Sequence, residues 1–259
     1  MIRGIYAVAV LDLKRFWLDR ARMIMGLVQP LLYLFVLGAG IGSSSTLGGN
    51  YQSFIFPGVL GLSMLFTATF AAISIVFDRQ IGFFKAVLVA PVSRTAIALG
   101  KIASGAMQAA VQGLIVLPFA PLAGVPLGVG ETCVLIGAML LACVTFSAIG
   151  VAFASRFTSV TVFPIISNAV LLPMFFLSGA LYPLTSAPHW MQVAAHLDPV
   201  AYAVDLMRGA VLGDFFFPPW LSLSVLAIVI ALLAWAAIRV FQRGEDDSSL
   251  GASKFSWKR

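Results

Sequence analysis

Six apolar runs, each long enough to cross a lipid bilayer, follow one another along most of the chain. They cover residues 23–42, 54–77, 96–120, 132–155, 158–182 and 220–238. A helix needs about twenty apolar residues to cross a hydrocarbon core of about 30 Å. The pattern therefore predicts an all-α membrane protein, with six transmembrane helices in a transmembrane domain over residues 23–238.

Residues 1–22 show a helical alternation of apolar and charged positions instead of an unbroken apolar run. The apolar positions recur at steps of three and four, at Tyr6, Ala9, Val10, Leu13, Phe16 and Trp17. The charged positions follow the same spacing on the opposite side, at Asp12, Arg15, Asp19 and Arg22. This pattern predicts an amphipathic helix in the membrane interface, with a soluble helix packed on a partner as the alternative. The early charges also argue against a signal peptide.

A short charged segment interrupts the apolar runs between the second and third predicted spans. No Asp, Glu, Lys or Arg occurs from Met23 to Phe77. Charged residues then appear at Asp78, Arg79, Lys85, Arg94 and Lys101. A basic segment between two spans is typical of the cytoplasmic surface. We therefore expect residues 78–95, approximately, to form a docking element for a soluble partner.

Residues 183–218 form a long predicted non-spanning region between the last two spans. Its four prolines, with Pro219 directly after it, separate two stretches with helical spacing, which predicts two short amphipathic helices that dip into the outer leaflet. His189 and His196 share a helix face near Asp198, but an interfacial role is favoured over a metal site. Asp205 and Arg208, three positions apart, are expected to pair with each other or to cap the helix.

Uncharged polar and aromatic side chains within the spans are candidates for helix contacts or for a substrate pathway. The polar set is Gln108, Gln112, Ser167 and Asn168, and the aromatic set includes Phe66 and Phe70. Hydrogen bonding between helices is the favoured role of each polar residue, and packing is favoured for the aromatic ones. Small residues four positions apart, such as Gly150 and Ala154, favour close packing within one chain over a dimer seam.

Composition and charge support the membrane interpretation and predict its orientation. The chain is 61% hydrophobic and 10% charged, with a net charge of +6, whereas about 25% of the residues are charged in ordinary soluble domains. Fifteen of the sixteen Lys and Arg residues lie in 1–22, 78–101, Arg156 and the polar tail 239–259. This distribution argues against nucleic-acid binding and predicts that both termini, and the tail, are cytoplasmic.

The sequence lacks the motifs of an energy-converting or catalytic site. It contains no Walker phosphate loop, because Gly100-Lys101 is followed by Ile102, and no H-E-x-x-H or G-x-S-x-G. Cys133 and Cys143 lie in one apolar run with a spacing that suits neither a disulfide framework nor a metal site. We therefore expect no enzyme activity, no metal and no cofactor in this chain, and either passive transport or transport driven by a partner.

Two sequence blocks resemble the membrane subunits of type-2 ABC exporters, a family that includes permeases for drugs, lipo-oligosaccharides and polysaccharides. The first is FIFPGVLGLSMLFTATFAAISIVFDRQIGFFKAVLVAPVSRTAIALGK at 54–101, and the second is FLSGALYPLTSAPHWMQVAAHLDPVAYAVDLMRG at 176–209. They resemble the family's second span with its cytoplasmic coupling helix, and its outward re-entrant helices. Glu131, which lies on the outer side of the fourth span, has no assigned role.

The resemblance implies a homodimer of permeases in a bacterial inner membrane, with two copies of a separate ATPase that bind ATP and Mg²⁺. It implies that the ATPase contacts residues around the coupling helix, namely Asp78, Arg79, Gly82, Phe83, Phe84, Lys85, Pro91 and Arg94. The uncharged spans favour an amphipathic or lipid-linked substrate. The alternative is a partner-independent channel or secondary carrier, which is disfavoured because the spans lack central charges and no inverted repeat is visible.

Overall fold

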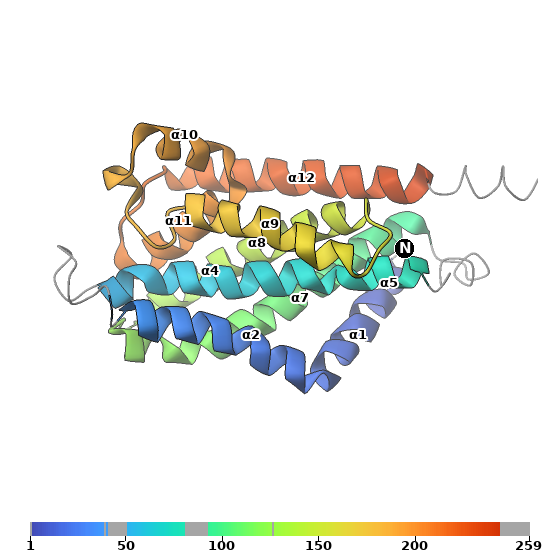
Figure 1. The fold of residues 1–259 in the computed structure, drawn as a ribbon, viewed down its shortest axis with the longest axis horizontal. Helices are drawn as coiled ribbons and strands as arrows, with labels where there is room; N and C mark the ends of the chain where they lie inside the picture. Colours follow the sequence, from blue (N-terminus) through green and yellow to red (C-terminus); the bar gives the residue numbers. More distant parts are fainter. Residues whose placement is uncertain (1, 39, 41–50, 81–92, 126, 244–259) are drawn as a thin grey trace, which may run out of the picture.

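The protein is a bundle of long helices that lie side by side along one axis (Figure 1). A computed structural model describes residues 2–38, 40, 51–80, 93–125 and 127–243. Within these ranges, every regular element is a helix. The larger elements are α1 (Ile2–Leu18), α2 (Arg20–Leu32), α4 (Tyr51–Ala71), α5 (Ile73–Gln80), α7 (Arg94–Val116), α8 (Val129–Ala154), α9 (Val162–Leu177), α10 (His189–Leu197), α11 (Pro199–Leu212) and α12 (Pro219–Arg243). Short helical turns are η1 (Tyr33–Leu37), η2 (Leu117–Phe119), η3 (Pro121–Ala123) and η4 (Leu184–Ser186).

Five helical stretches in the described part of the chain are long and apolar enough to cross a membrane. They are Arg20–Leu37, Tyr51–Gln80, Thr95–Phe119, Val129–Ala154 and Pro219–Gln242. The predicted span 158–182 contains only α9, which has 16 residues and is therefore about 24 Å long. The apolar run continues beyond the helix, but Gly179 with φ +72° turns the chain away. The all-helical prediction is confirmed, and six spans remain a prediction.

The central helix of the bundle is α4, because small residues let other helices approach it closely. The window of Tyr51–Gln80 is 72% buried. A Cβ atom at Gly61 would lie 3.1 Å from Val204 of α11, and a Cβ atom at Gly150 of α8 would lie 2.7 Å from the Cα of Thr69. The predicted use of Gly150 for packing within one chain is confirmed.

The N-terminal segment differs from the predicted single interfacial helix. It forms α1, a corner at Asp19 and the start of α2, where the Asp19 carboxylate accepts a hydrogen bond from the Arg22 amide. α1 packs on α7, and Gly100 allows an approach in which its Cβ position lies 3.0 Å from Val8. Phe16 is buried, but Trp17 is exposed and Asp12 is only 5% exposed. The prediction that Asp12 lies on the outward charged face was wrong, since it faces a buried lysine described below.

The two helices predicted between the last spans are present as α10 and α11, but α11 lies deep in the bundle. Residues 200–210 are all buried, and α11 packs on α4, α8 and α12. Asp205 and Arg208 were expected to pair with each other or to cap the helix, and the hydrogen bonds of both side chains go to separate backbone partners. Asp205 accepts hydrogen bonds from the amides of Phe216 and Phe217, whereas Arg208 donates to the Gly179 carbonyl at 2.8 Å.

Candidate functional site

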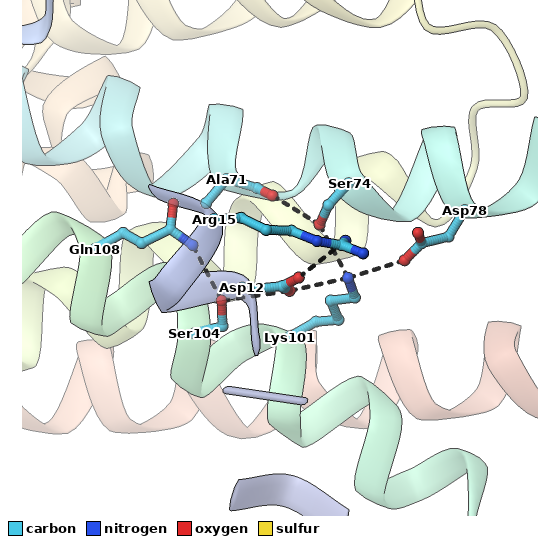
Figure 2. Close-up of polar contacts among 8 residues, drawn as sticks. All are labelled: Asp12, Arg15, Ala71, Ser74, Asp78, Lys101, Ser104 and Gln108. Atoms are coloured by element: carbon cyan, nitrogen blue, oxygen red, sulfur yellow. Dashed lines mark hydrogen bonds and ion pairs between the residues drawn. The ribbon is translucent and has the colours of Figure 1, made fainter. Parts of the chain in front are cut away.

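The strongest polar site in the described residues is a buried ion cluster where α1, α5 and α7 meet (Figure 2). Lys101 of α7 is 7% exposed. Its Nζ lies 2.9 Å from Oδ2 of Asp12, 3.0 Å from Oδ2 of Asp78 and 3.0 Å from Oγ of Ser74. An ammonium group has three N–H donors, so all three are used. The cluster therefore joins three helices through one side chain.

Further polar groups extend the cluster on both sides. Arg15 lies at 3.6 Å from Oδ1 of Asp12 and is largely exposed. On the inner side, Ser104 donates to Asp12 at 3.4 Å, and the Gln108 amide donates to Ser104 at 3.0 Å. Two buried carboxylates facing one ammonium are unfavourable unless they are further compensated, and Arg15 and Ser104 supply that compensation at Asp12. The result is a connected polar chain from Asp78 to Gln108.

Arg79 connects the same end of α5 to α8 and α12. Its Nη1 donates to the carbonyl of Ser155, which follows the last residue of α8, at 2.6 Å. Its guanidinium also lies 5.8 Å from the ring centroid of Phe241 in α12. A cation at a helix C-terminus is favourable because it complements the helix dipole. The adjacent residues Asp78 and Arg79 thus connect α5 with α1, α7, α8 and α12.

The predicted partner-docking residues follow directly after this junction. Gly82, Phe83, Phe84, Lys85 and Pro91 lie outside the described residues. Arg94 is described only by its backbone, as the first residue of α7, and Ser93 caps that helix by accepting from the Ala96 amide at 3.3 Å. Of the predicted set, the structure therefore places the side chains of Asp78 and Arg79, and both belong to the junction. Such a junction has no groups arranged for catalysis, but it can transmit force between helices.

The predicted pathway residues fall into two groups. Gln108 and Gln112 lie on one face of α7 and are 2% and 1% exposed. Asn168 is partly buried on α9, and the rings of Phe66 and Phe70 on α4 lie tilted to each other with centroids 5.7 Å apart. The structure therefore brings only the two glutamines into line with the ion cluster.

The remaining candidates have structural partners. Glu131 accepts from the Gly128 amide at 3.0 Å and so caps the first turn of α8. Nδ1 of His196 lies 2.7 Å from the Gln192 carbonyl, and its ring packs against Phe217. The described residues contain no group of three or more His, Cys, Asp or Glu side chains suited to a metal. His189 is the first residue of α10.

Asp198 has an unusual protonation equilibrium for a capping residue. Its Oδ1 accepts from the Val200 amide at 2.9 Å at the start of α11. Burial of the carboxylate raises the pKa of Asp198 to about 7, against the lowering effect of that one hydrogen bond. Since α10 and α11 lie outside the candidate spans, this group is a candidate for a pH effect on the fold.

Sequence reasoning missed the role of Asp12 and Lys101. The two residues are 89 positions apart, so no local pattern joins them. A signal was present nonetheless, because Lys101 lies several residues inside an apolar run and needs a buried counter-ion there. Asp12 sits between apolar neighbours one turn away on α1, at Ala9 and Phe16, and both are buried.

Comparisons with known proteins match the chain to one family over most of its length. Residues 3–212 match the family described as ABC-2 type transporter. The chain is 31% identical to Nodulation protein J of Rhizobium leguminosarum bv. viciae over 229 residues, which cover 82% of this chain and 83% of that protein. It is 28% identical to the inner membrane transport permease YadH of Escherichia coli K12 over 252 residues, which cover 94% and 95%. It is also 29% identical to the putative transport permease ycf38 of Porphyra purpurea over 202 residues, which cover 74% and 68%.

Proposed function

The chain belongs to the ABC-2 type transporter family, and from this premise we propose that it is the permease subunit of an ATP-driven exporter. In this proposal, a separate ATPase chain binds ATP and Mg²⁺, and the permease itself catalyses no reaction. The sequence supports this division because it contains no Walker phosphate loop. The exporter contains two permease copies and two ATPase copies.

The observation that carries the proposal is the junction immediately before residues 81–92. A partner that moves this segment acts directly on Asp78 and Arg79, which hold α1, α7, α8 and α12 through polar contacts. Phe83 and Phe84 supply an aromatic anchor for the ATPase, and Lys85 supplies a positive rim. The movement produced by ATP-driven closure of the two ATPase copies is then transmitted to most of the bundle through two adjacent residues, Asp78 and Arg79.

The charge distribution supports a bacterial inner-membrane location with both termini in the cytoplasm. The segments assigned to the cytoplasmic side carry fifteen of the sixteen Lys and Arg residues. In this orientation, α5 and the ion cluster face the cytoplasm, whereas α10 and the start of α8 face outward. The similar protein YadH is named an inner membrane permease, which supports the same location here.

The side chains that the candidate spans expose indicate which class of molecule the protein transports. The candidate spans expose mainly apolar side chains, which suits an amphipathic or lipid-linked molecule better than a free ion. A partner-independent channel or secondary carrier is the alternative function. That alternative predicts transport by the purified permease alone in liposomes, without any ATPase.

The test is copurification of a Walker-motif ATPase with the tagged permease, followed by ATP hydrolysis by the complex. We expect the double variant Phe83→Asp and Phe84→Asp to lose at least nine-tenths of the bound ATPase. The matched control is Leu197→Asp on α10, since Leu197 is 83% exposed and lies on the side assigned outward. Retention of the ATPase by the double variant would remove the docking proposal, and full transport without ATPase would end the exporter proposal.

A further inference from the structure

A polar row on α7 leads from the ion cluster towards the middle of the bundle. Lys101, Ser104, Gln108 and Gln112 are spaced by three, four and four residues, so they lie on one helix face. Hydrogen bonds connect the first three of them, partly through Asp12. The row then ends in unpaired groups, because Oε1 of Gln108 and both polar side-chain atoms of Gln112 have no hydrogen-bond partner.

α2 covers the unpaired end of this row. Gly26 of α2 approaches Gln112 so closely that a Cβ atom there would lie 3.2 Å from Nε2 of Gln112. Yet α2 is the most weakly held of the candidate spans, since the window of Arg20–Leu37 is only 11% buried. Its course is also irregular, with a corner at Asp19, Pro30 inside the helix and a π-helical turn at Tyr33–Leu37. π-helical turns and internal prolines are frequent where helices bend or carry function.

The closed contact between α2 and α7 is energetically unfavourable for the two amides. A buried polar group without a partner destabilises the fold, and Gln108 and Gln112 together contribute three such atoms. Separation of α2 from α7 would expose the Gln112 amide, at the end of the row, to partners. A weakly held helix that covers unsatisfied amides is therefore poised to move off them.

We propose that Gln108 and Gln112 form a hydrogen-bonding site that opens when α2 separates from α7. The site takes the uncharged, hydroxyl- or amide-bearing part of an amphipathic molecule, and this assignment rests on the exporter function proposed above. Amide side chains offer both donors and acceptors, which matches such a group.

The charges near the row already balance one another, so they do not call for a charged ligand. Three carboxylates and three cations surround its outer end, namely Asp12, Asp19, Asp78, Arg15, Arg22 and Lys101. Arg22 has one unpaired nitrogen, but it lies near both Asp12 and Asp19. An anionic headgroup is therefore the less favoured occupant, and the experiment includes it as a separate arm.

The first experiment separates a ligand role from a packing role with the double variant Gln108→Met and Gln112→Met. Because methionine has a similar length and no unpaired amide, the thermal unfolding midpoint of the single variant Gln112→Met should stay equal to that of the wild type or rise. The midpoint is read from this single variant because Gln108 also donates to Ser104. Photolabelling of α2 and α7 by a diazirine-bearing alkyl maltoside in proteoliposomes should fall at least fivefold, relative to labelling of the exposed face of α12. Ser222→Ala is the control, since Ser222 Oγ on α12 is also buried and unpaired, and it should leave the labelling of α2 and α7 unchanged.

Two results of this experiment would overturn the proposal. One is unchanged maltoside labelling in the double variant, or labelling of the seam by diazirine-bearing phosphatidylglycerol in place of the maltoside. The other is a lower unfolding midpoint of Gln112→Met, which would show that the Gln112 amide is already satisfied in the folded protein. Labelling is measured twice, with the permease alone and with the permease in the presence of ATPase and ATP. If no ATPase partner is found, that result counts against the exporter function, while labelling of the permease alone still tests the site.

A second experiment tests the movement itself. Gly26→Cys and Gln112→Cys, in a background with Cys133→Ser and Cys143→Ala, are joined by a short bis-methanethiosulfonate reagent. We expect crosslinking to lower ATP hydrolysis by the permease–ATPase complex at least fivefold, and reduction to restore it. The same reagent should leave the hydrolysis of each single-cysteine variant at the level of that variant without reagent. Unchanged hydrolysis after complete crosslinking would show that α2 and α7 stay together and would overturn the proposal.

Discussion

Asp12 of α1 and Lys101 of α7 form a buried ion pair of 2.9 Å across 89 positions of sequence. Lys101 also holds Asp78 at 3.0 Å, so the pair connects the N-terminal helix with the end of α5. The pair explains how a charged residue of an amphipathic helix tolerates burial. Through Lys101, the pair also links α1 to Asp78, the first residue of the segment that we assign to the ATPase.

Replacing Lys101 should be among the most destabilising single changes in the bundle. Lys101→Met leaves two buried carboxylates without their cation, and breaking a buried pair in this way costs about 3–5 kcal/mol. Asp12→Asn should cost less, because Lys101 keeps Asp78 and the new amide still accepts a hydrogen bond. The midpoints of thermal unfolding in one detergent would give this order.

Arg15→Ala is the matched control for the ion cluster. Arg15 lies 3.6 Å from Asp12, but its side chain is 55% exposed, and exposed pairs contribute about 0–1 kcal/mol. Its unfolding midpoint should therefore remain close to that of the wild type. A loss for Lys101→Met as small as that for Arg15→Ala would contradict the central role of Lys101.

Arg208 and Phe54 should contribute to stability as a coupled pair. The Arg208 guanidinium lies 4.1 Å from the Phe54 ring centroid. It also donates a hydrogen bond of 2.8 Å to the carbonyl of Gly179, a residue that follows α9. Arg208→Lys loses the planar stacking, so we expect a loss of about 1–3 kcal/mol. Combining it with Phe54→Leu should cost less than the sum of the single losses, by about 0.5–2 kcal/mol. Fully additive losses in chemical unfolding would show that the two side chains act independently.

The local apolar pattern was sufficient to predict the helices but not their tertiary partners. The runs at 54–77, 96–120 and 132–155 became α4, α7 and α8 because an apolar segment of that length satisfies its backbone only as a helix in lipid. The two helices at 183–218 were also predicted from spacing. The burial of α11 was missed, because Asp205 and Arg208 suggest an interfacial helix until their distant partners at 216–217 and 179 are known.

The candidate site shows the same division between local and distant information. Asp78 and Arg79 were predicted from the sequence because charged residues directly after a long apolar run indicate the end of a span. Their contacts with Lys101 and Ser155 depend on how α5, α7 and α8 pack, and no periodicity reports that. The end of α9 was missed for a different reason, since hydropathy does not detect the turn at Gly179.

Asp198 should make the stability of the protein depend on pH. Because burial raises its pKa from 3.8 to about 7 in the folded protein, the folded state binds the proton more tightly than the unfolded state. Stability should therefore rise as pH falls from 8 towards 4, by at most about 1.4 kcal/mol per pH unit between the two pKa values.

Asp198→Asn supplies the comparison for this pH effect. Its amide oxygen still caps α11 at the Val200 amide, but the side chain no longer titrates. The difference in unfolding free energy between variant and wild type should therefore change with pH between 4 and 8, while other titrating groups cancel. A difference that stays constant over this range would exclude Asp198 as the source.

The native cysteines provide a direct test of orientation. Cys133 is exposed near the start of α8, whereas Cys143 is buried, so only Cys133 should react with a thiol reagent in the folded protein. If both termini are cytoplasmic, Cys133 lies on the outer side, and a membrane-impermeant maleimide should label it in intact cells. The control is Arg156→Cys in a Cys133→Ser background, because Arg156 is exposed at the opposite end of α8. Its labelling should require permeabilised cells, and the reverse pattern of labelling would invert the topology and remove the ion cluster from the cytoplasmic side.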